Sequence, residues 1–118
     1  MIRRPPRSTL DRSSAASDVY KRQHVTCKEA VDSNGVHKIL KMAYDNCPFV
    51  RVLNEGDAPD TKNVKGTNYI DIGCAYDKRT NRIMLMSAED NLIKGASGQA
   101  IQSFNLMCGF DVQTGLNL

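Results

Sequence analysis

The chain has 118 residues, a mass of 13.1 kDa and 41% hydrophobic residues, which allows one modest domain with a small core. Its formal net charge is +3, but residues 1–23 hold six basic and two acidic residues, and residues 24–118 hold 10 basic and 11 acidic ones. The part with apolar periodicity therefore lacks the basic surface of a nucleic-acid-binding module. The longest apolar run, residues 83–86, is far too short to span a membrane.

The first 23 residues mix Arg, Ser and Pro with few apolar side chains, and we expect them to be disordered. Their Arg- and Ser-rich composition could indicate an organellar transit peptide. The stretch SSAASDVYKRQ at residues 13–23 instead resembles sequencing-adapter DNA translated into protein, which is the interpretation we favour. We therefore divide the chain into a non-native segment, residues 1–23, and a partial domain, residues 24–118.

Residues 29–47 show helical periodicity. Val36, Ile39, Leu40 and Ala43 form one apolar stripe, and Ser33 or Asn34 is suited to cap the helix. The helix is expected to end before Pro48, because the residue before a proline avoids the helical conformation. Residues 49–53 then predict a short strand.

After a polar loop, residues 69–76 and 82–88 predict two strands joined by a hairpin loop, and therefore an antiparallel sheet. A second helix is expected over residues 95–108, ended by Gly109. Its expected apolar face is Ala96, Ala100, Ile101, Phe104, and Met107 or Cys108. The predicted fold is α+β, an antiparallel sheet with helices packed on one face.

Residues 91–98 are the segment most suggestive of chemistry. Gly95, Ala96 and Gly98 at a helix start let another backbone or a ligand approach, and the amide of Asn91 offers both an acceptor and a donor. Such a pair of groups can hold another carboxamide. The alternative is structural: the small residues permit close packing of helix and sheet, and Asn91 completes its own turn.

The same segment carries a resemblance to a known family. Residues 87–102, SAEDNLIKGASGQAIQ, are similar to the late motif of N-acetyl-gamma-glutamyl-phosphate reductases. PFVRV at residues 48–52 resembles a strand of that family, and TKNVKGTNY at residues 61–69 resembles its TKxVxGSN segment. NLMCG at residues 105–109 and TGL at residues 114–116 resemble its last helix and tail. The resemblance covers residues 25–118.

This resemblance implies part of the C-terminal domain of a reductase with a fold like that of glyceraldehyde-3-phosphate dehydrogenase. The implied reaction is NADP-dependent reduction of N-acetyl-glutamyl 5-phosphate to the semialdehyde, an oxidoreductase step of arginine, and so amino-acid, biosynthesis. In the family a Cys thiolate attacks the acyl phosphate and a His acts as acid and base. Asn91 falls where the related dehydrogenases hold the nicotinamide carboxamide, and homo-oligomers are expected.

The sequence departs from the family in what it lacks. The family's Gly-Cys-Tyr-Pro-type nucleophile segment, its Thr-Pro-His-type segment and a Gly-x-Gly-x-x-Gly fingerprint do not occur. The residues with the required chemistry lie in other contexts, and we expect them to be structural or solvated: Cys27, Cys47, Cys74, Cys108, His24, His37, Asp57, Asp60, Glu89 and Asp90. We therefore expect no catalytic residue in this chain and no activity from the chain alone, with the bound NADP held mainly by a separate N-terminal domain.

The cysteines are widely spaced, with no CxxC or Cys/His pair, so neither a metal site nor a disulfide framework is expected. No apolar signal segment is present, and the cytoplasm is the expected compartment. Two alternatives stay open: a fragment of the aspartate-semialdehyde dehydrogenase type, and a small non-catalytic α+β interaction module.

Overall fold

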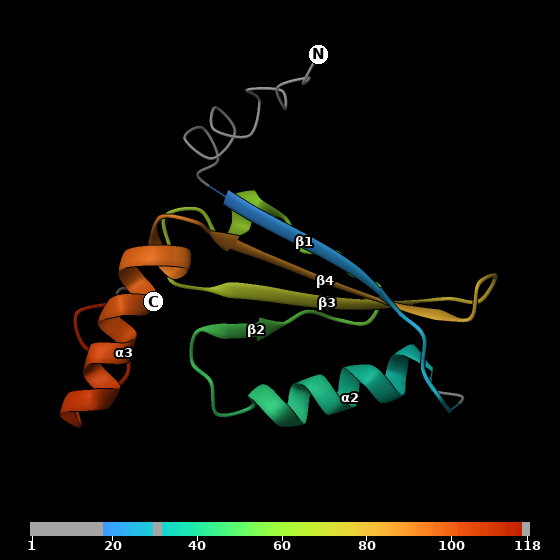
Figure 1. The fold of residues 1–118 in the computed structure, drawn as a ribbon, viewed down its shortest axis with the longest axis horizontal. Coiled ribbons are helices and arrows are strands. Elements are labelled where there is room, and N and C mark those ends of the chain that lie inside the picture. Colours follow the sequence, from blue (N-terminus) through green and yellow to red (C-terminus); the bar gives the residue numbers. More distant parts are fainter. Residues whose placement is uncertain (1–17, 30–31, 117–118) are drawn as a thin grey trace, which may run out of the picture.

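The computed structural model describes residues 18–29 and 32–116. Its strands and α-helices are labelled as in Figure 1, and the elements follow in chain order: β1 (Asp18–Val25), α2 (Ser33–Tyr44), β2 (Val50–Val52), the short 3-10 helix η1 (Thr61–Asn63), β3 (Ile70–Asp77), β4 (Arg82–Asp90), the π-helical turn η2 (Ile93–Ser97) and α3 (Gly98–Cys108). The strands form one sheet in the order β1-β4-β3-β2 (Figure 1). The α+β class that the sequence predicts is therefore confirmed.

The sheet is mixed, which corrects the expectation of a purely antiparallel one. β4 pairs antiparallel with both β1 and β3, but β2 pairs parallel with β3. Parallel neighbours need a long crossover between them, and residues 53–69 supply it. The sequence predicted the hairpin of β3 and β4 because only a short loop joins them, whereas the pairing of β2 depends on this longer connection.

β1 covers residues that we expected to be disordered. Residues 18–23 lie in this strand, with Tyr20 opposite Ala88 and Arg22 opposite Met86 of β4. Composition misses such an edge strand because its main-chain hydrogen bonds to β4 do not depend on an apolar side-chain pattern. Residues 1–17 lie outside the described residues, and whether residues 1–23 are native stays a prediction.

Two different structures cover the two faces of the sheet. Cys74 and Gly73 are neighbours in β3 and so face opposite sides. The Cys74 thiol donates to the Ser33 carbonyl of α2 at 3.8 Å. A Cβ on Gly73 would lie 2.5 Å from the Asp57 carbonyl oxygen. Thus α2 packs along β2 and β3 on the Cys74 face, beside β2 in Figure 1, and the crossover packs against the other face at Gly73.

The face of α2 that turns inward differs from the predicted stripe. Ile39 is 63% exposed, whereas Ser33 is buried, His37 and Leu40 are half-buried, and the His37 Nε2–H donates to the Leu53 carbonyl at 2.9 Å. The N-cap is Asp32, whose carboxylate accepts from the Gly35 N–H at 2.8 Å, and not Ser33 or Asn34. The side of α2 that faces inward is therefore the one that makes polar contacts with the crossover, and not its most apolar side.

α3 lies beyond the end of the sheet and not on its face (Figure 1). The apolar side chains that we expected to be buried are exposed, including Ile101 at 41% and Phe104 at 57%. The buried residues of the helix are Gly98 and Asn105, and the Asn105 amide donates to the carbonyls of Val112 and Thr114. Gly109 ends the helix in the left-handed conformation at φ 72°, as predicted.

Candidate functional site

The carboxylate of Asp90, the last residue of β4, organises the turn that follows. Its Oδ1 accepts from the backbone N–H groups of Leu92 at 2.8 Å and Ile93 at 3.1 Å, and its Oδ2 accepts from the Gly66 N–H at 2.8 Å. Asp90 is only 5% exposed. Burial by itself raises the pKa of this carboxyl, but the three backbone donors and the nearby Lys65 outweigh burial, so the pKa is lowered. In the structure Asp90 therefore caps the turn, and its lowered pKa favours the carboxylate form.

Asn91 is the first residue of the turn after β4, residues 91–97, which includes η2 and follows the Asp90 cap. Its side chain is half-buried, and its Oδ1 would lie 3.1 Å from a Cβ on Gly95. The same Cβ would lie 3.6 Å from the carboxylate of Glu89. Gly95 thus leaves room for both polar side chains, and Gly95, Ala96 and Ser97 are exposed next to them. A contact between Asn91 and a cofactor stays a prediction.

A network of three side chains on the far side of this turn was missed from the sequence. The Oε1 of Gln102 accepts from the Lys94 ammonium at 2.8 Å and from the Asn68 amide at 3.2 Å. Burial lowers the pKa of Lys94, although Glu89 and Cys47 act in the opposite direction. Three separate segments meet here, and no local spacing in the sequence indicates their contact.

Gly98 lies against this network. A Cβ at this position would come within 2.1 Å of Asn68 Oδ1 and 2.8 Å of the Ile93 carbonyl oxygen. Asn68 is 1% exposed, and its Oδ1 has no hydrogen-bond partner among the described residues. For Gly98 the structure therefore supports the packing interpretation of the small-residue motif.

The residues with nucleophilic or acid–base chemistry are scattered. Cys74 is buried in β3, where burial, and after it the charge of Glu55, raises the pKa of its thiol, so a thiolate is disfavoured. Cys47 and Cys108 are exposed, and Cys27 is half-buried. His24 is exposed in β1, where it lies opposite Met84 of β4.

Two acids of the crossover, Asp57 and Asp60, take part in packing and capping. Asp60 caps η1, accepting from the Lys62 N–H at 3.0 Å, and that hydrogen bond is the main cause of its lowered pKa. Asp57 contributes its backbone carbonyl to the packing against Gly73. Among residues 18–29 and 32–116, no group of three His, Cys, Asp or Glu side chains is arranged to hold a metal ion. Over the same residues no helix has the length and apolar character needed to cross a membrane.

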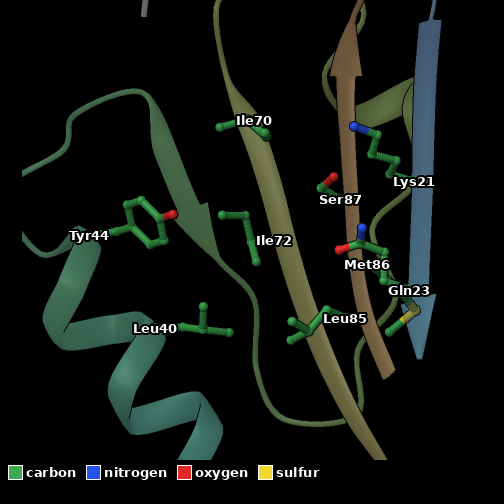
Figure 2. Close-up of a pocket in the computed structure, with 9 residues that line it drawn as sticks. All are labelled: Lys21, Gln23, Leu40, Tyr44, Ile70, Ile72, Leu85, Met86 and Ser87. Carbon is green, nitrogen blue, oxygen red and sulfur yellow. The ribbon is translucent and has the colours of Figure 1, made fainter. Parts of the chain in front are cut away.

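A groove of about 220 Å³ lies between α2 and the sheet (Figure 2). Leu40 and Tyr44 of α2 approach Ile72 of β3 across it, and residues of β1 and β4 line the remaining side. Its lining is mostly apolar and includes neither Asn91 nor Lys94. The groove is therefore separate from Asn91, and the turn after β4 stays the candidate site.

Comparison with known proteins places the chain in a known family. The family model for the semialdehyde dehydrogenase dimerisation domain matches residues 16–91, and the chain belongs to this family. The fold agrees with a solved structure, aspartate semialdehyde dehydrogenase II from Vibrio cholerae, at a TM-score of 0.62 and 21% identity, over 78% of this chain and 27% of that one.

Two curated relatives share one enzyme name, which makes the resemblance more specific than the family alone. The N-acetyl-gamma-glutamyl-phosphate reductase of Akkermansia muciniphila is 58% identical over 89 residues, 75% of this chain and 26% of that protein. The enzyme of the same name from Geobacillus stearothermophilus is 47% identical over 93 residues, 79% of this chain and 27% of that protein. The resemblance stated from the sequence motifs is thus confirmed. The chain spans about a quarter of the relatives that it matches.

Proposed function

We propose that this chain supplies the C-terminal-domain part of an NADP-dependent N-acetyl-gamma-glutamyl-phosphate reductase of arginine biosynthesis. The observation that carries this proposal is the 58% identity to a protein of that name over 89 residues, 75% of this chain. The substrate is then the small acyl phosphate N-acetyl-glutamyl 5-phosphate, and the product is its semialdehyde. The enzyme works in the cytoplasm as a homo-oligomer, which the family's description as a dimerisation domain supports.

Asn91 is the residue of this chain that we assign to the cofactor. Its carboxamide is half-buried beside Gly95, and three residues of η2, Gly95, Ala96 and Ser97, are small, so a flat carboxamide fits against them. NADPH supplies the hydride of the reaction. The described residues supply a fixed position for the end of the cofactor that carries the nicotinamide, and the chemistry of bond formation belongs to residues outside this chain.

The proposal is tested in a chimera. Residues 24–116 of this chain replace the matching segment of the Akkermansia muciniphila reductase, and NADPH oxidation is followed with the acyl phosphate, or NADP reduction with the semialdehyde. We expect the chimera to turn over and the 118-residue chain alone to show no activity. A folded chimera without activity would contradict the proposed function, and turnover by the chain alone would contradict the absence of catalytic residues.

Asn91→Ala in the active chimera tests the assigned contact. Loss of a buried polar contact costs about 1–3 kcal/mol, so kcat/KM for NADPH should fall by roughly 5- to 150-fold. Asn46→Ala is the matched control, because Asn46 is an exposed asparagine between α2 and β2. If both variants keep the kinetics of the parent chimera, Asn91 is only a turn residue.

A further inference from the structure

The turn that carries Asn91 is attached on both sides to one segment of the crossover. Before the turn, the Asp90 carboxylate accepts from the Gly66 N–H at 2.8 Å. After it, the Asn68 amide donates to Gln102 at 3.2 Å. The two attachments bridge 24 and 34 positions of the sequence and reach residues only two apart. The turn is therefore held from both ends against the same support.

Gln102 is the central group of the second attachment. Its single carbonyl oxygen accepts from Asn68 and also from the Lys94 ammonium, 2.8 Å away on the turn itself. Lys94 is confined further by Phe49, whose ring centroid lies 5.8 Å from the ammonium nitrogen. Phe49 is 1% exposed, so its ring is held in place by the packing around it. The Gln102 Oε1 atom of α3 is therefore hydrogen-bonded both to the turn, through Lys94, and to the crossover, through Asn68.

A π-helical turn needs such ties because its main-chain geometry is less favourable than that of an α-helix. In η2 the Ser97 N–H reaches back to the Leu92 carbonyl at 3.1 Å, across five residues. This arrangement presents Gly95 next to the Asn91 side chain. Relaxation of η2 to an ordinary α-helical turn would change the position of Gly95 relative to Asn91.

We propose that Gln102 is a positioning residue that, through Lys94 and Asn68, keeps η2 in the form that presents Asn91 to the cofactor. This inference rests on the proposed function. Gln102 itself does not touch the cofactor. It acts through the turn, so its removal should loosen the turn and weaken the use of NADPH while leaving the remainder of the sheet intact.

The experiment compares Gln102→Met, which has no acceptor of comparable strength, with Gln102→Glu, whose carboxylate accepts from both donors. Gln99→Met is the matched control, because Gln99 is exposed on the same helix. Lys94→Met, which removes one donor only, is the second variant if Gln102→Met does not fold. Hydrogen exchange of the amides at residues 92–98 is measured in the 118-residue chain, and KM for NADPH and kcat are measured in the chimera.

We expect Gln102→Met to accelerate exchange at residues 92–98 by about tenfold, the effect of losing one or two hydrogen bonds, with Gln102→Glu and Gln99→Met close to the parent. KM for NADPH should rise with kcat less affected, and Gln102→Glu should restore it. Exchange in Gln102→Met equal to that in Gln99→Met would overturn the proposal, as would faster exchange without a change in KM. An inactive parent chimera would refute the proposed function instead, while the exchange data would still decide whether Gln102 holds the turn.

Discussion

Gly98→Ala is the substitution whose outcome the structure determines most sharply. The added Cβ would lie 2.1 Å from Asn68 Oδ1 and 2.8 Å from the Ile93 carbonyl oxygen. Both distances are far shorter than van der Waals contact. Asn68 is 1% exposed and its amide is bonded to Gln102, so it cannot move away without losing that hydrogen bond. The variant must therefore distort the junction of η2 and α3.

The expected loss of stability follows from opposing contributions. Overpacking of this kind costs about 1–3 kcal/mol, and loss of the hydrogen bond to Gln102 adds about 1 kcal/mol. Alanine is favoured over glycine in a helix by roughly 0.5–1 kcal/mol, which acts in the opposite direction. We therefore expect a net destabilisation of about 2 kcal/mol, or roughly 10 °C in Tm for an ordered domain of this size.

The assay is urea unfolding of the 118-residue chain, followed by circular dichroism. Gln99→Ala, one residue along the helix and exposed, serves as the control for adding an alanine. In an Asn68→Ala background two of the three close contacts of the new Cβ disappear, so Gly98→Ala should cost clearly less there. The reasoning is refuted if Gly98→Ala is as stable as Gln99→Ala, or if the Asn68→Ala background brings no relief.

Two further predictions concern titratable groups. The pKa of Asp90 is lower in the folded chain than its ordinary value of 3.8, so its contribution to stability is present above about pH 4 and is lost as the pH falls through the folded pKa. Asp90→Asn should thus cost about 1–3 kcal/mol in urea unfolding at pH 7 and progressively less at acid pH, and an unchanged gap at pH 2 would contradict the assignment. Because burial raises the pKa of Cys74, a thiol reagent at pH 8 should modify Cys47 and Cys108 first and Cys74 only on unfolding; rapid modification of folded Cys74 would show that it is accessible.

The sequence predicts those parts of the fold that depend on local pattern. The hairpin of β3 and β4 follows from two apolar runs joined by a short loop, and Asp77 and Asn81 complete that loop as turn-forming residues do. The end of α3 at Gly109 follows from its left-handed conformation. Both features are decided within a few residues of the chain, so a pattern within one sequence is enough to show them.

The sequence does not predict what depends on distant partners. β2 joins β3 in parallel because of where the crossover passes, and the candidate site depends on Asn68 meeting Gln102 across 34 positions. Asn91, Gly95 and Gly98 are recognisable in the sequence because they lie close together along it. Lys94 and Gln102 were not singled out, since each in isolation is an ordinary polar residue of a helical segment.

α3 shows how a correct pattern can still give a wrong burial assignment. Residues 98–108 contain no charged side chain, and apolar residues such as Phe104 and Met107 nonetheless lie exposed, at 57% and 86%. The inner side of the helix is held by amide groups, with Asn105 bonded to the carbonyls of Val112 and Thr114. Exposed apolar surface of this extent is typical of a contact with further protein. Within the described residues α3 therefore packs through its amide groups while its apolar residues stay exposed, which is why an apolar periodicity alone gives the wrong buried face.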